Sequence, residues 1–128
     1  IAVEVGKKRK EISVKQLPTE YPIFDIGANT IERYGKIIKN AKSIVFSGPV
    51  GVFENDEFAT GTKKILEAIA ASKAYSLVGG GDTVSAVEKF GFAKKMSYIS
   101  TAGGALIEFL MGEKLPGVVA LEKAAART

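Results

Sequence analysis

The stretch that decides the fold is residues 75–90, YSLVGGGDTVSAVEKF. Residues 75–78 form a short apolar run, which predicts a buried strand. Three glycines follow directly at 79–81, and Asp82 then stands where a helix N-cap is expected. Because apolar residues continue at helical spacing, the stretch predicts a strand, a bare glycine turn and a helix.

The composition of the glycine turn is suited to binding an anion. A tight turn needs one glycine, whereas Gly79, Gly80 and Gly81 are consecutive and leave the main chain uncovered. A helix N-terminus adds unpaired N–H groups and a partial positive charge, so we expect residues 79–83 to bind phosphate. The stretch is neither a Walker A loop nor a G-x-G-x-x-G fingerprint. Asp82 is either an N-cap or a carboxylate that reaches Mg²⁺ on a nucleotide phosphate, and both alternatives stay open.

Outward from this stretch, the chain alternates strands and helices. Apolar runs at 23–27, 43–46 and 97–100 predict further strands, and helical patterns follow each of them. Residues 1–5 and 11–14 alternate apolar and polar side chains and predict a β-hairpin. We therefore expect one α/β domain over residues 1–128, with a parallel, Rossmann-like sheet in a three-layer α/β/α arrangement and an N-terminal hairpin.

Three of the predicted strands end in a loop that contains glycine, after Phe46, Val78 and Ser100. Ligands of such sheets bind outside the carboxyl ends of the strands, so these loops predict one crevice. Gly103 and Gly104 are a weaker anion site on their own, since a glycine pair before a helix is often only a turn. Glu54, at the end of the first loop, is either an exposed acid or an acceptor for ribose hydroxyls.

The composition limits the chemistry. The chain has no cysteine and no histidine, which excludes thiolate chemistry and the commonest general base. Its net charge is +4, and the basic run at residues 7–10 is expected to be a solvated turn rather than a nucleic-acid patch, because aromatic residues do not interleave with it. No apolar run is long enough to span a bilayer, so we expect neither membrane nor nucleic-acid partners.

Several motifs together resemble the phosphoglycerate kinase family. The quoted motifs are Asp25-Ile26-Gly27 with Thr30, Ser47-Gly48-Pro49-Val50-Gly51-Val52-Phe53-Glu54, Val78-Gly79-Gly80-Gly81-Asp82-Thr83, Ser100-Thr101-Ala102-Gly103-Gly104-Ala105 and Leu115-Pro116-Gly117-Val118. They occur in the family's order and spacing over residues 25–121, whereas the hairpin and the tail match weakly. The lysine-containing hairpin and the Ile-Gly sequence in the loop resemble archaeal-type members of the family.

The resemblance implies a two-lobed cytoplasmic kinase that transfers a phosphoryl group between 1,3-bisphosphoglycerate and ADP, forming 3-phosphoglycerate and ATP, with Mg²⁺. This chain resembles the later part of the lobe that binds ATP or ADP. The implied nucleotide contacts are Pro49, Val52, Glu54, Gly79, Gly80, Gly81, Asp82 and Thr83. Glu54 would bind the ribose and Asp82 the Mg²⁺. Catalytic contacts to the transferred phosphoryl group are implied for Gly80, Gly81, Gly103 and Gly104.

Two positions depart from the family pattern. Ser47 stands where asparagine is common, and Ala102 stands where many members have glycine. The substrate lobe and the first half of the nucleotide lobe are expected to be missing, so this chain alone is expected to be an inactive fragment. The alternatives are a stand-alone module that binds a nucleotide or a sugar phosphate without catalysis, and a structural domain that only shares the fold.

Overall fold

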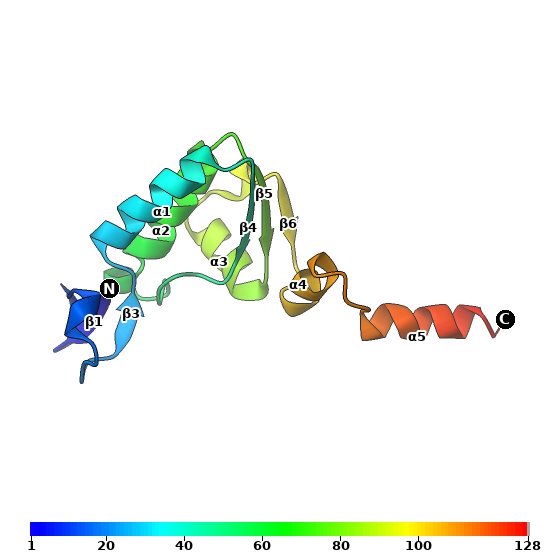
Figure 1. Ribbon diagram of the computed structural model, residues 1–128, viewed down its shortest axis with the longest axis horizontal. Coiled ribbons are helices and arrows are strands. Elements are labelled where there is room, and N and C mark those ends of the chain that lie inside the picture. The colour runs from blue at the N-terminus through cyan, green and yellow to red at the C-terminus, as the bar shows by residue number, and fades with distance from the viewer. Residues whose placement is uncertain (128) are drawn as a thin grey trace.

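The computed structural model describes residues 1–127, which form two three-stranded sheets (Figure 1). The first sheet is antiparallel, has the order β2-β1-β3 and consists of β1 (Ala2–Val5), β2 (Lys8–Glu11) and β3 (Ile23–Asp25). The second sheet is parallel and consists, in chain order, of β4 (Ser43–Ser47), β5 (Tyr75–Gly79) and β6 (Tyr98–Ser100). The predicted α/β class, with a parallel sheet and an N-terminal hairpin, is confirmed.

Helices connect the strands and extend beyond them. They are α1 (Ala28–Asn40), α2 (Thr60–Ala71), α3 (Gly81–Lys89), α4 (Gly104–Leu110) and α5 (Pro116–Ala125), with short 3-10 turns at Val14–Gln16, Asp56–Phe58 and Ala93–Lys95. Helices α1 and α2 lie side by side, whereas α5 projects away from the rest of the molecule (Figure 1). Within the described residues, no helix is both long and apolar enough to cross a membrane.

The core lies between the parallel sheet and the helices. Phe46 and Val78 point from neighbouring strands to this side, where they join apolar residues of α2 and α3. Leu66 of α2 is fully buried there. Phe58, just before α2, is also fully buried, and its ring lies against that of Phe24 in β3. A buried side chain of this size stabilises the fold by about 1.5–3 kcal/mol. The packing of the sheet against α2 therefore fixes the positions of the strand ends from which the loops begin.

The opposite face of the parallel sheet is mostly open. Val45, Tyr75 and Tyr98 are 51%, 58% and 55% exposed on this face. Helix α4 meets it at the carboxyl end of β5, where Leu106 lies against Gly79. Among the described residues, α1, α2 and α3 therefore lie on one side of the sheet, and α4 represents the expected third layer on the other (Figure 1).

The hairpin has a different register from the predicted one. Strand β2 begins at Lys8, not at Glu11, so the basic run lies mostly in a strand. The turn consists of Gly6 and Lys7, which both have positive φ (57° and 64°), as two-residue hairpin turns with the right-handed strand twist require. The prediction of a solvated basic turn is wrong at Arg9, because its side chain is 15% exposed and pairs with Asp25.

Strand β3 also differs from its expected place. The alternation of strands and helices put residues 23–27 in the parallel sheet, but β3 pairs antiparallel with β1. Its residues are adjacent to the hairpin rather than to a preceding crossover helix, and a crossover helix is what parallel pairing needs. The result places the buried Asp25 where the hairpin sheet meets α2 and the loop around Gly51.

One helix start differs from the predicted one. The N-cap of α3 is Gly80 and not Asp82, which lies in the first turn of the helix. The N-cap of α1 is Gly27. Helix α5 begins at Pro116, since a proline fits the first helical position, where no N–H partner is needed. The tail is helical up to Ala125, and Thr128 lies outside the described residues.

Helix α1 shows that the apolar pattern overestimated burial. Tyr34 and Ile37, which follow the helical apolar pattern, are 43% and 59% exposed. Helix α1 packs mainly against α2, so only part of its apolar stripe is covered.

Candidate functional site

The loops after the three parallel strands meet at one edge of the sheet. Ser47 at the end of β4 is aligned with Gly79 of β5, and Gly79 is aligned with Ser100 at the end of β6. The connections that begin there are residues 48–54, Gly80 and residues 101–103. The predicted convergence of the three loops is therefore present.

Gly80 and Gly103 bring two of these loops into contact. A Cβ atom on Gly103 would lie 3.2 Å from Cα of Gly80, and one on Gly80 would lie 3.6 Å from Cα of Gly103. Gly80 also has φ +98° and ψ 143°, a conformation that residues with a side chain rarely adopt. Glycine is thus required at position 80 by its backbone conformation, and at position 103 a side chain would be tightly packed against the other loop.

Gly81 and Gly104 are the first residues of α3 and α4 and have free space beside them. Outside its own helix and chain neighbours, no atom of the described residues would lie within 4 Å of a Cβ at either position. The first N–H groups of a helix lack partners in the helix itself. These two helix starts therefore offer main-chain donors beside open space.

Gly79 is closely packed on the other side. A Cβ atom there would collide with Leu106 and come within 2.9 Å of the carbonyl oxygen of Ala102. The absence of a side chain at Gly79 is thus needed for the packing of α4 and the Gly103 loop against β5. The structure therefore explains the three consecutive glycines differently. Gly79 is needed for packing and Gly80 for its backbone conformation, whereas no atom of the described residues crowds the Cβ position of Gly81 beyond its own helix and chain neighbours.

Thr83 connects the first loop with α3. It is 1% exposed, and its Oγ1 atom accepts a hydrogen bond of 2.7 Å from the N–H of Gly48. Ser47 lies nearby, with its Oγ 3.7 Å from the Cβ position of Gly80. Thr83 thus holds the 48–54 loop to the start of α3, a role that the sequence pattern did not indicate.

The two candidate carboxylates, Asp82 and Glu54, are exposed at this edge. Asp82, in the first turn of α3, is favoured there by the positive end of the helix dipole. Within residues 1–127, no group of three or more Asp and Glu residues is placed to bind a metal ion. A single exposed carboxylate fits Mg²⁺ that is bound mostly by nucleotide phosphates and water, since Mg²⁺ often has only one or two carboxylate ligands.

The 48–54 loop is fixed at its far end by Lys89 of α3. The Nζ atom of Lys89 donates to the carbonyl oxygen of Phe53 at 2.8 Å and pairs with Asp56 at 3.1 Å. The Phe53 side chain is buried, whereas Val52 is 40% exposed. This arrangement leaves Val52 and Glu54 facing outward beside a fixed main chain. Lys89 was missed because a lysine in the last turn of a helix is usually solvated.

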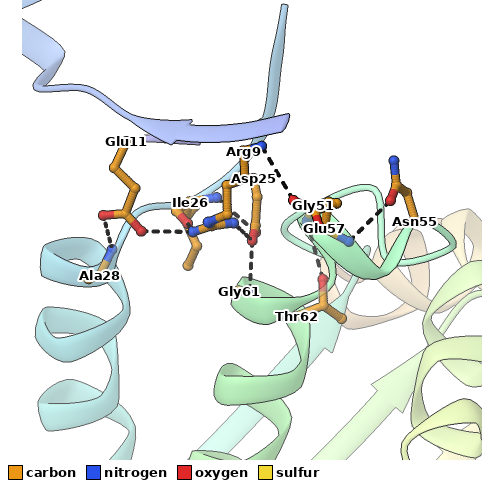
Figure 2. A network of polar contacts seen from close by, with 10 residues as sticks. All are labelled: Arg9, Glu11, Asp25, Ile26, Ala28, Gly51, Asn55, Glu57, Gly61 and Thr62. Carbon is orange, nitrogen blue, oxygen red and sulfur yellow. Dashed lines mark hydrogen bonds and ion pairs between the residues drawn. The ribbon is translucent and has the colours of Figure 1, made fainter. Parts of the chain in front are cut away.

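A second polar network, also missed by the sequence analysis, surrounds Asp25 (Figure 2). Its carboxylate accepts hydrogen bonds from Arg9 Nη1 at 2.6 Å and from the N–H groups of Ile26 and Gly61, both at 2.8 Å. Arg9 Nη2 also donates to Glu11 at 2.9 Å, and Glu11 accepts the N–H of Ala28 at 3.0 Å. The only sequence signal was a carboxylate within an apolar strand.

The network changes two pKa values. Burial lowers the pKa of Arg9, but hydrogen bonds and charges from Glu11 and Asp25 outweigh it, so that this pKa is raised. The pKa of Glu11 is lowered, mainly by the hydrogen bond from the N–H of Ala28 and then by Arg9. Both residues therefore stay ionised at neutral pH, and Arg9 is a permanent cation beside Asp25.

Comparisons with known proteins show which family and fold this chain is similar to. A model of the family described as phosphoglycerate kinase matches residues 1–113, so the hairpin, which resembled the family only weakly by sequence, lies within the match. A phosphoglycerate kinase structure from Coxiella burnetii is 46% identical, with a TM-score of 0.78 over 83% of this chain and 28% of that one. One from Pyrococcus horikoshii OT3 is 40% identical, with a TM-score of 0.84 over 99% of this chain and 32% of that one.

The chain spans about a third or less of the length of these two kinases. Its match to the family model covers most of the chain, and both structural matches exceed 0.7 in TM-score. The chain belongs to the phosphoglycerate kinase family.

Proposed function

We propose that this chain is the later part of the nucleotide-binding lobe of a phosphoglycerate kinase, a single domain over residues 1–128. The whole enzyme would transfer a phosphoryl group reversibly between 1,3-bisphosphoglycerate and ADP, in the cytoplasm. The observation that carries this proposal is the contact between Gly80 and Gly103 at one edge of the sheet, with a helix start beside each. Two bare backbone turns at that spacing suit a polyphosphate, which needs donors from more than one side.

The phosphate contacts follow from the two helix starts. Gly80 and Gly81 would donate main-chain N–H groups to the nucleotide phosphates, and Gly103 and Gly104 would face the transferred phosphoryl group from the other loop. Such donors are already oriented before the reaction and need no reorganisation as charge moves. The attacking group is a carboxylate or a phosphate oxygen that carries no proton, so this chemistry needs no histidine base.

The nucleoside would lie along the 48–54 loop. Pro49 is half-buried and Val52 is exposed, so they would offer an apolar edge to the nucleotide, and Glu54 would accept hydrogen bonds from the ribose hydroxyls. Gly79 shapes the turn by allowing α4 to pack closely, and Thr83 fixes the loop through Gly48. These two residues would support the nucleotide site by holding its walls.

Asp82 would reach a Mg²⁺ ion bound to the nucleotide phosphates. When bound, Mg²⁺ neutralises phosphate charge and orients the phosphate oxygens. The contribution of this chain is an exposed carboxylate one residue after the first donor of α3. Asp82 also interacts favourably with the helix dipole, so stability and metal binding have to be measured separately.

The test is titration of the chain with ADP, with and without Mg²⁺, by isothermal calorimetry. We expect Asp82→Asn to weaken MgADP binding about tenfold or more, as for the loss of one charge-assisted contact, and to change binding of metal-free ADP little. Glu88→Gln is the matched control, since it removes one negative charge from the exposed end of the same helix. Equal affinities of the wild type and Asp82→Asn for MgADP would exclude the metal role. No binding of MgADP by folded wild-type chain would overturn the proposed function.

The chain alone is expected to lack kinase turnover, because the lobe that binds 3-phosphoglycerate is not among its residues. A coupled assay with 1,3-bisphosphoglycerate, ADP and Mg²⁺ checks this, and ATP formation by the purified chain would contradict it. Neither a nucleic acid nor a membrane is expected to bind. If MgADP binds but no enzyme with a substrate lobe contains this sequence, the stand-alone binding module becomes the better description.

A further inference from the structure

The Asp25 network lies outside the residues that face the proposed phosphate site, yet it contacts the nucleotide loop directly. Asp25 is at the end of β3, its side chain is fully buried, and it accepts three hydrogen bonds. One of them comes from the N–H of Gly61 in the first turn of α2. The carboxylate therefore joins the hairpin sheet to α2 through an ionic contact in the interior.

The same carboxylate occupies the space next to Gly51. A Cβ atom on Gly51 or on Gly61 would collide with the Asp25 carboxylate. Position 51 belongs to the 48–54 loop, three residues before Glu54. Glycine at these two positions is thus explained by Asp25, and the loop main chain lies directly on its carboxylate.

Further main-chain contacts make this part of the loop rigid. The N–H of Val52 donates to the carbonyl oxygen of Phe24 at 2.8 Å, one residue before Asp25. The N–H of Gly51 donates to Oγ1 of the buried Thr62 at 3.2 Å (Figure 2). The loop is therefore fixed by β3 and α2 just before Glu54, in addition to the contact of Lys89 with the carbonyl oxygen of Phe53.

Arg9 fixes Asp25 in turn. Its guanidinium group donates to Asp25, to Glu11 and to the carbonyl oxygen of Ile26. A planar group with five donors can make these bonds together, which lysine cannot. No buried side-chain nitrogen or oxygen atom of the described residues lacks a partner, so the network is complete and has one favoured arrangement.

From these contacts we propose that Asp25 is a positioning residue for nucleotide binding, which through Gly51 and the first turn of α2 sets the place of the Glu54 carboxylate. The proposal deepens the proposed function and rests on it. Asp25 does not touch the nucleotide. It acts on the ribose end of the site and leaves the Gly80 and Gly103 loops unchanged.

The test compares two nucleotides in the presence of Mg²⁺, ADP and 2′,3′-dideoxy-ADP, which lacks both ribose hydroxyls. We expect Asp25→Asn to weaken ADP binding about tenfold, the order of one charge-assisted hydrogen bond, and to change binding of dideoxy-ADP less than twofold. A purely structural role would reduce the affinities for both nucleotides equally. Glu67→Gln, which breaks an exposed ion pair on α2, is the control and should change neither affinity.

Asp25→Asn removes the partner of a buried cation, so a second variant covers the case in which it fails to fold. Arg9→Lys keeps the positive charge but loses the planar set of donors, and we expect a smaller loss for ADP with the same insensitivity to dideoxy-ADP. Equal losses for both nucleotides, or no loss in a folded variant, would overturn the inference alone. If the wild type binds neither nucleotide, the proposed function itself fails.

Discussion

Replacing Gly81 with alanine should separate the stability of the fold from nucleotide binding. Gly81 is the first residue of α3, does not have a positive φ, and has free space where a Cβ atom would be, as far as the described residues show. Alanine at such a position reduces the entropy of the unfolded chain without strain. We therefore expect Gly81→Ala to raise the free energy of unfolding by about 0.4–1 kcal/mol.

The same methyl group would occupy space that the proposed phosphate needs. A phosphate oxygen must come within about 3 Å of the main-chain nitrogen to accept its hydrogen bond. Loss of one charge-assisted hydrogen bond costs about 1.5–3 kcal/mol, which corresponds to a rise of about 10- to 150-fold in the Kd for MgADP. Calorimetric titration measures the affinity, and urea unfolding followed by circular dichroism measures the stability.

The matched control is Gly35→Ala in α1, where a Cβ atom would also meet no atom of the described residues beyond its own helix. It should produce a similar gain in stability with an unchanged Kd. A folded Gly81→Ala chain whose Kd for MgADP stays within twofold of wild type would refute the assignment of this turn as the phosphate cradle.

Two further predictions concern the fold around the site. Gly79→Ala should destabilise the chain by about 1–3 kcal/mol, because the new methyl group collides with Leu106 and approaches the Ala102 carbonyl oxygen; an unchanged urea midpoint would contradict this packing. Glu11→Gln should lower stability at pH 7 by about 0.5–1 kcal/mol, since the exposed carboxylate interacts with a helix start and a cation. Because the pKa of Glu11 is lowered in the folded chain, its carboxylate contributes stability above the ordinary pKa of 4.5, and this contribution is lost as pH falls through the folded-state pKa. The wild type and Glu11→Gln should therefore become equally stable in acid. A constant difference in stability down to pH 2 would rule out the ionic contribution.

The parallel sheet and its loops were predictable because their signals are local. Apolar runs that end in glycine identified β4, β5 and β6, and the order of strands and helices implied parallel pairing. That pairing brings Gly80 and Gly103 together without any information on side chains. The family resemblance rested on the same loops, which explains why the fold and the family agree.

The Asp25 network could not be predicted because it depends on long-range contacts. Arg9 stands in a run of basic residues, and nothing local distinguishes it from its neighbours. Its burial follows only from the hairpin register and from β3 pairing with β1 instead of joining the parallel sheet. Asp82 is a similar case: a short polar residue after a glycine turn suggests an N-cap, but the N-cap is Gly80, two residues earlier, with a positive φ.

The most direct test of the central claim is an amide-resolved NMR titration of the chain with MgADP. We expect the largest shifts at the amides of Gly80, Gly81, Gly103 and Gly104, with a second group around Glu54 and almost none along α1 or α5. In the Gly81→Ala chain, the shifts at the Gly80 and Gly103 turns should be lost before those around Glu54. Shifts confined to α5 or to the hairpin, or a spectrum that does not change at millimolar MgADP, would contradict the claim that these turns bind the nucleotide phosphates.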